Sequence, residues 1–181
     1  MDEFLRWAAD TTTTLVAVLV GITIAGFVLV VWRLMRLPPT RAVGHTARDL
    51  AVMAAIAVIV VPTLLSPLDV VVETPRLRII PFEDLRDAFV GRYSLGLAVI
   101  ELVGNVAIFM PLGMALRWRF PALGVLQVGA VALGVSVSVE VLQALTGGGR
   151  WPETTDVITN TAGGLVGAAL AGMALVRESR S

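Results

Sequence analysis

The sequence predicts an all-α, polytopic membrane protein with about five transmembrane helices, its N-terminus outside and its C-terminus in the cytoplasm. Two observations predict the fold class, and a third gives the orientation. The chain of 181 residues is 56% hydrophobic and only 15% charged, whereas a soluble domain is typically about a quarter charged. It contains five long apolar runs, and its arginines are distributed unevenly between the segments that join them. Such a chain needs an apolar solvent, which is the bilayer.

Each apolar run is close to the roughly 20 residues that cross a bilayer as a helix. The runs cover residues 12–32, 50–65, 94–116, 122–145 and 157–176. The second is the shortest, so we expect it to recruit residues 47–49 or to thin the bilayer locally. The first begins after a net acidic N-terminus and ends in a stop-transfer pattern, Trp32-Arg33-Leu34-Met35-Arg36. It is therefore predicted to be a true span and not a cleaved signal peptide.

The arginines set the orientation, because cytoplasmic loops are enriched in basic residues. With the N-terminus outside, the inner segments hold eight Arg against two acids, and the outer segments hold six Arg against ten acids. We therefore predict a multi-pass protein of a bacterial plasma membrane with an N-out, C-in topology.

The predicted organisation has three parts. Residues 1–66 form two helices with a basic cytoplasmic loop, residues 67–176 form an outer loop followed by three helices, and residues 177–181 form a cytoplasmic tail. Within the outer loop, residues 82, 85, 89 and 90 are apolar at helical spacing. This spacing predicts an amphipathic helix on the outer membrane surface, with a solvated connecting loop as the alternative.

Composition excludes several kinds of chemistry. The absence of Cys rules out disulfides, thiolate nucleophiles and Cys-type zinc sites. The single His45 lies in the predicted loop before the second span, where a solvated side chain is the usual state. We therefore expect no metal and no cofactor. A net charge of zero gives no reason to expect a nucleic-acid partner.

Polar residues inside the last three spans are the informative ones, because a charged side chain at the bilayer centre costs about 2.5 kcal/mol or more. The predicted topology places all of them towards the outer side, below a glycine-rich loop that carries an arginine. The predicted binding residues are Glu101, Asn105, Glu140, Gln143, Arg150, Asp156 and Asn160.

The last span also carries small residues at intervals of three and four. These residues are Gly163, Gly164, Gly167, Ala168, Ala171 and Gly172. Small residues at this spacing let another helix backbone approach closely. We expect the third or fourth span to pack there.

An ordered set of motifs in the second half resembles the VanZ-like family. The motifs are Asn105-x-x-x-Phe109-x-Pro111-x-Gly113, Glu140-x-x-Gln143, Arg150, Asp156-x-x-x-Asn160-x-x-Gly163 and Ile80-Pro81-Phe82. They cover about residues 79–172, so the outer loop and three helices correspond to the family's domain. The resemblance implies an association with resistance to the glycopeptide teicoplanin, and it implies no catalytic mechanism.

Three functions stay open beside a purely structural role. In the first, the protein binds membrane lipids or a lipid-linked cell-wall precursor, with Arg150 holding an anionic group. In the second, it is an enzyme with Glu140 or Asp156 as general base. In the third, Glu101 and Glu140 form the proton relay of a transporter. A homo-oligomer is compatible with each of them.

The structural alternative assigns the same residues to packing. The amides would join helices through hydrogen bonds, and Asp156 would be the N-cap of the last span. Against this alternative, Glu140 together with Arg150 is a costly way to achieve packing.

Overall fold

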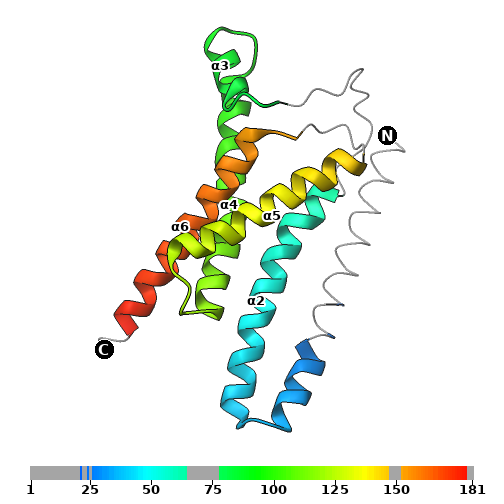
Figure 1. Cartoon of the computed structure of the whole chain (residues 1–181), viewed down its shortest axis with the longest axis vertical. Coiled ribbons are helices and arrows are strands. Elements are labelled where there is room, and N and C mark those ends of the chain that lie inside the picture. Colours follow the sequence, from blue (N-terminus) through cyan, green and yellow to red (C-terminus); the bar gives the residue numbers. More distant parts are fainter. Residues whose placement is uncertain (1–20, 22–23, 25, 65–77, 147–151, 179–181) are drawn as a thin grey trace. The chain divides into compact units, whose positions relative to one another are not determined.

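The computed structural model describes residues 21, 24, 26–64, 78–146 and 152–178 (Figure 1). The chain divides into two compact units, Met1–Pro67 and Leu68–Ser181. Within the described residues the regular structure is helical, apart from one isolated β-bridge. Four of the described helices are long and apolar enough to cross a membrane. These findings confirm the all-α, polytopic membrane fold.

In the first unit, helix α2 runs from Pro39 to Leu64 and includes the predicted second span. The prediction that the helix begins near residue 50, after a loop containing His45, is wrong. The helix begins at Pro39, and proline suits the first position of a helix because its missing N–H would be unpaired there in any case.

Polar contacts explain why the helix extends so far. Thr46 donates to the carbonyl oxygen of Ala42 at 2.9 Å and accepts from Arg33 at 3.1 Å. Arg33 also forms an ion pair with Asp49. Thr46 and Asp49, two polar residues of the predicted loop, therefore have partners within helical structure.

Residues 26–34, at the end of the predicted first span, are helical. Gly26 packs so closely on α2 that a Cβ placed there would lie 2.8 Å from a methyl carbon of Leu50. The earlier part of this span falls almost entirely outside the described residues.

The second unit contains α3 (Glu83–Phe89), α4 (Leu95–Arg119), α5 (Val125–Thr146) and α6 (Thr154–Glu178). The last three confirm the predicted third, fourth and fifth spans, with ends shifted by one to three residues. Ser94 caps α4 by accepting a hydrogen bond from the N–H of Leu97 at 3.4 Å. The short α3 confirms a helix within the loop that is predicted to lie outside, and it packs against α4.

Helix α6 packs along both α4 and α5, which contact each other far less (Figure 1). Gly163 and Gly167 face α4, where an added Cβ would overlap backbone carbonyl oxygens. Gly164 faces α5, where a Cβ would overlap that of Ala132. The small residues of α6 therefore serve close backbone approach to both neighbours, as their spacing predicts.

Candidate functional site

Predicted site residues join α4, α5 and α6 by hydrogen bonds between their side chains. Asn105 of α4 donates from Nδ2 to Oδ1 of Asp156 in α6 at 2.7 Å. One turn further along α6, Asn160 donates to the hydroxyl of Ser136 in α5 at 3.0 Å, and both residues are buried. Asn105 thus connects α6 to α4, and Asn160 connects α6 to α5.

Glu140 lies in the interior, with 6% of its surface exposed. Its Oε2 accepts a hydrogen bond from the backbone N–H of Glu153 at 3.0 Å. Gln143, one turn along α5, is also buried. Glu140 therefore stabilises the stretch of chain that enters α6.

A set of contacts, which we call the clamp, ties residues 78–82 to residues 152–155. Arg78 and Glu153 form a parallel β-bridge. The N–H of Arg78 donates to the carbonyl of Pro152 at 3.3 Å, and the carbonyl of Arg78 accepts from the N–H of Thr154 at 3.1 Å. At the other end, the N–H of Phe82 donates to the hydroxyl of Thr155 at 2.8 Å.

The Arg78 side chain adds an ionic contact to the clamp. Its Nη1 lies 2.6 Å from Oδ2 of Asp84 and 2.9 Å from Oε1 of Glu153. Burial alone would lower the pKa of Arg78, but the two carboxylates outweigh this effect and hold it above its ordinary value. Arg78 therefore remains a cation that joins α3 to the start of α6.

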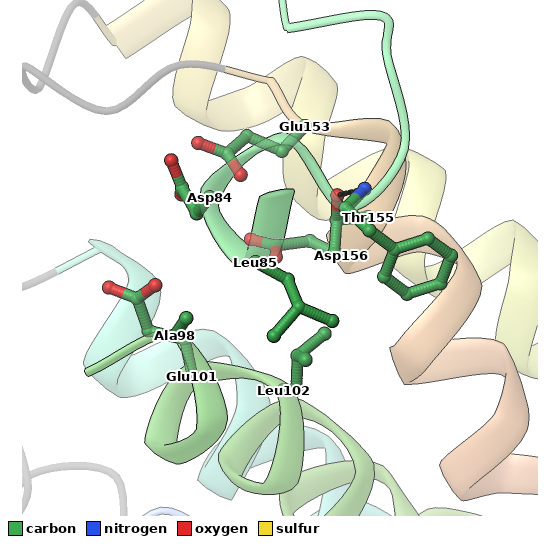
Figure 2. A pocket seen from close by; sticks show the side chains of 9 residues that line it. Asp84, Leu85, Ala98, Glu101, Leu102, Glu153, Thr155 and Asp156 are labelled. Atoms are coloured by element: carbon green, nitrogen blue, oxygen red, sulfur yellow. Dashed lines mark hydrogen bonds between the residues drawn. The ribbon is translucent and has the colours of Figure 1, made fainter. Parts of the chain in front are cut away.

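A small pocket lies beside the clamp, between α3, the N-terminal part of α4 and the start of α6 (Figure 2). Its lining residues are Phe82, Asp84, Leu85, Ala98, Glu101, Leu102, Glu153, Thr155 and Asp156. Four of these are carboxylates. The described part of the pocket is thus rich in hydrogen-bond acceptors, and Leu85, Ala98 and Leu102 give it an apolar side.

The pKa of Glu153 is raised to about 7. Burial is the largest cause, because it disfavours the charged form. Arg78 acts in the opposite direction, whereas Asp156, Asp84 and Glu101 add further repulsion. Glu153 therefore changes its charge near neutral pH at the edge of the pocket.

Tyr93, just before α4, donates its phenolic hydrogen to Oε1 of Glu101 at 2.9 Å. Burial and this hydrogen bond raise the pKa of Tyr93 to about 12. Tyr93 is therefore a protonated donor that orients Glu101 beside the pocket.

The predicted residues divide into three groups. Glu101 and Asp156 line the pocket, and Asn105 holds Asp156. Glu140, Gln143 and Asn160 are buried and do not belong to the pocket lining. Arg150 lies outside the described residues. The alternative role of Asp156 as N-cap is wrong, because α6 begins at Thr154 and Asp156 lies within its first turn.

Sequence reasoning missed Arg78, Asp84, Glu153 and Ser136 as members of this site. Ser136 carries a signal, since it lies one turn before Glu140 on the same face of α5. Asp84 and Arg78 carry none, because both are ordinary charged residues of a loop. Among the described residues, no three His, Asp or Glu side chains are arranged to hold a metal ion.

Comparisons with known proteins agree with the motifs. The model of the VanZ/LLP1 family matches residues 50–175, well over half of the chain. Protein VanZ of Enterococcus faecium is 40% identical over 73 residues, which are 40% of this chain and 45% of that protein. The match thus spans less than half the length of this relative. No solved structure matches the chain. The family match, together with the ordered motifs on α4, α5 and α6, shows that the chain belongs to the VanZ/LLP1 family.

Proposed function

We propose that the chain is a multi-pass protein of the bacterial plasma membrane that binds a lipid-linked or anionic envelope ligand beside the clamp. Through this ligand it would contribute to tolerance of glycopeptides such as teicoplanin. The observation that carries the proposal is the pocket itself, where polar side chains of three helices meet an apolar side at one end of the membrane-spanning unit. A ligand with a polar head and an apolar chain matches these two kinds of surface.

The described residues favour particular groups on the ligand. Carboxylates accept hydrogen bonds, so Asp84, Glu101 and Asp156 suit hydroxyl or amine groups. Arg78 is already held between Asp84 and Glu153. Recognition of a phosphate therefore falls to Arg150, which lies three residues before Glu153 in the sequence, since a guanidinium binds phosphate oxygens in pairs.

Binding to the purified, reconstituted protein tests this proposal. We expect saturable binding of undecaprenyl phosphate or of a lipid-linked cell-wall precursor, weakened by Arg150→Ala and by Asp156→Asn. Arg180→Ala, in the predicted cytoplasmic tail, is the matched control and should leave binding unchanged. Absence of saturable binding to the unaltered protein would contradict the proposal.

Tolerance in cells is the second test. Glu140→Gln and Arg150→Ala should each abolish any teicoplanin tolerance that the protein confers, while the amount of protein in the membrane stays the same. Glu140→Gln acts indirectly here, because it replaces the charged acceptor of the Glu153 backbone N–H with a neutral oxygen, which forms a weaker hydrogen bond. Unchanged tolerance in both variants would separate this site from the phenotype.

An enzyme acting on a lipid-linked phosphate or acyl substrate is the second candidate, and the titration of Glu153 favours it. A general acid or base works best when its pKa lies near the working pH, and the pKa of Glu153 is about 7. Glu153 is thus a further candidate for the general base, beside the predicted Glu140 and Asp156. Release of phosphate or of an acyl product, lost in Glu153→Gln while binding persists, would establish the enzyme.

A further inference from the structure

The segment around α3 exposes large apolar side chains before the start of the helix and at its end. Ile79 and Ile80 precede α3, and Phe89 and Val90 lie at its end. Phe89 is 75% exposed and Ile79 is 65% exposed, and the other two are more than half exposed. Because α3 has only seven residues, four such side chains form an unusually apolar surface for a loop of this length.

The basic side chains of this segment are more exposed than its acidic side chains. Arg86 and Arg92 are exposed. The acids are partly covered, and Asp84 is held by Arg78. The most exposed part of the segment therefore combines apolar side chains with cations, and its acids are less exposed. This combination is typical of elements that lie in a membrane interface and contact anionic lipid phosphates.

This surface adjoins a face of α4 that is exposed along a spanning helix. Helix α3 packs against α4, and Leu97, Ile100 and Val103 of α4 are all more than half exposed. A spanning helix turns such residues towards lipid. The apolar surface of the α3 segment therefore lies next to the lipid-facing surface of the same unit, with no described element covering it.

We infer that residues 79–92 lie in the membrane interface at the N-terminal end of α4, with Ile79, Ile80, Phe89 and Val90 in the upper acyl region. Arg86 and Arg92 contact the phosphates of anionic phospholipids. This inference is independent of the proposed ligand. It also gives the pocket a position at headgroup depth, since Phe82, Asp84 and Leu85 of the same segment line it.

Site-directed spin labelling of the full chain tests the inference, and the natural absence of Cys makes every introduced thiol unique. Ile79→Cys and Phe89→Cys would carry nitroxides in vesicles of phosphatidylcholine with or without phosphatidylglycerol. Collisions with dissolved oxygen report lipid, and collisions with a water-soluble nickel chelate report solvent. Ile100→Cys provides the lipid-facing reference, and Leu85→Cys is the matched control on the covered side of α3.

Labels at positions 79 and 89 should collide more often with oxygen than with the chelate, as at position 100, whereas position 85 should be shielded from both. Phosphatidylglycerol should increase the oxygen preference at position 89, and Arg86→Gln with Arg92→Gln should remove that increase. The inference would be overturned if labels at positions 79 and 89 collided mainly with the chelate. It would also be overturned if these labels were shielded from both reagents, because a protein partner would then cover the segment. Insensitivity to phosphatidylglycerol would overturn the role of the arginines.

Discussion

The residues of the site are of two kinds. Some line the pocket, and others form hydrogen bonds that hold the lining residues in place. Asp156 and Glu153 line the pocket. Asn105 donates a hydrogen bond to Asp156, and Glu140 accepts one from the backbone N–H of Glu153. Buried polar groups of this kind are costly when a partner is removed. Substitutions of the two kinds should therefore have different effects on titration and on stability.

Glu153 should make the stability of the protein depend on pH. Its pKa rises from the ordinary 4.5 to about 7 in the folded protein, so between these values the folded state binds more protons than the unfolded state. The free energy of unfolding must then fall as pH rises from about 4.5 to about 7 and level off above that. Thermal unfolding in detergent across this range should show the fall, and Glu153→Gln should remove most of it. Parallel pH profiles for the two proteins would contradict this assignment.

Asn105→Ala should destabilise the second unit, because Asp156 loses the donor 2.7 Å away. Interhelical hydrogen bonds in membranes contribute about 0.6–2 kcal/mol, and we expect a loss in that range. Unfolding in mixed micelles with increasing dodecyl sulfate gives the measurement. Val103→Ala, on an exposed position of the same helix, is the control, and an equal loss in both variants would show that the hydrogen bond contributes nothing.

At the scale of the elements, the sequence predicts the spans well, because each spanning helix of the second unit coincides with an apolar run. It fails at the start of α2. Hydropathy treats Arg41, His45 and Arg48 as a loop, yet Arg33 pairs with Asp49 and Thr46 and allows the helix to begin earlier. Local hydropathy cannot predict that side chains of two helices will pair.

Gly163, Gly164 and Gly167 of α6 should be far less replaceable than helical glycines with open space around them. In Gly167→Ala the new methyl group would overlap the carbonyl oxygen of Met110 in α4, so the helices must separate. Overpacking of this kind costs about 1–3 kcal/mol. Gly134→Ala in α5 is the matched control, since nothing lies within 4 Å of its added Cβ, and alanine favours helix by up to about 1 kcal/mol. In the same unfolding assay, Gly167→Ala should be less stable than the unaltered protein, and Gly134→Ala should be more stable.

For the whole molecule, topology alone predicts that polar residues of α4, α5 and α6 gather at one end, and the hydrogen bonds Asn105–Asp156 and Glu140–Glu153 agree with that convergence. The clamp could not be predicted. Arg78 and Glu153 are 75 residues apart, and a backbone bridge between them depends on no particular side-chain type. Sequence reasoning therefore finds the polar residues of the spans and the loop before α4, and it misses the contacts between residues 78–82 and 152–155.

The N-out, C-in orientation stays a prediction that thiol labelling can test. Arg92→Cys, before α4, should react with a membrane-impermeant maleimide added outside intact cells. Ala122→Cys, between α4 and α5, should react only after the membrane is permeabilised. Both positions are exposed, so a failure to react reports sidedness and not burial. The reverse pattern would place the site on the cytoplasmic side.

The central position of α6 has a consequence for biosynthesis. Because α4 and α5 contact each other far less than each contacts α6, a growing chain that has inserted only these two helices holds Asn105 without Asp156, its hydrogen-bond partner in α6. Helix α6, which follows α5 in the chain, supplies Asp156. A product truncated before α6 would thus enter the membrane with the Asn105 amide unsatisfied, a feature by which quality-control proteases can distinguish it from a chain that contains α6.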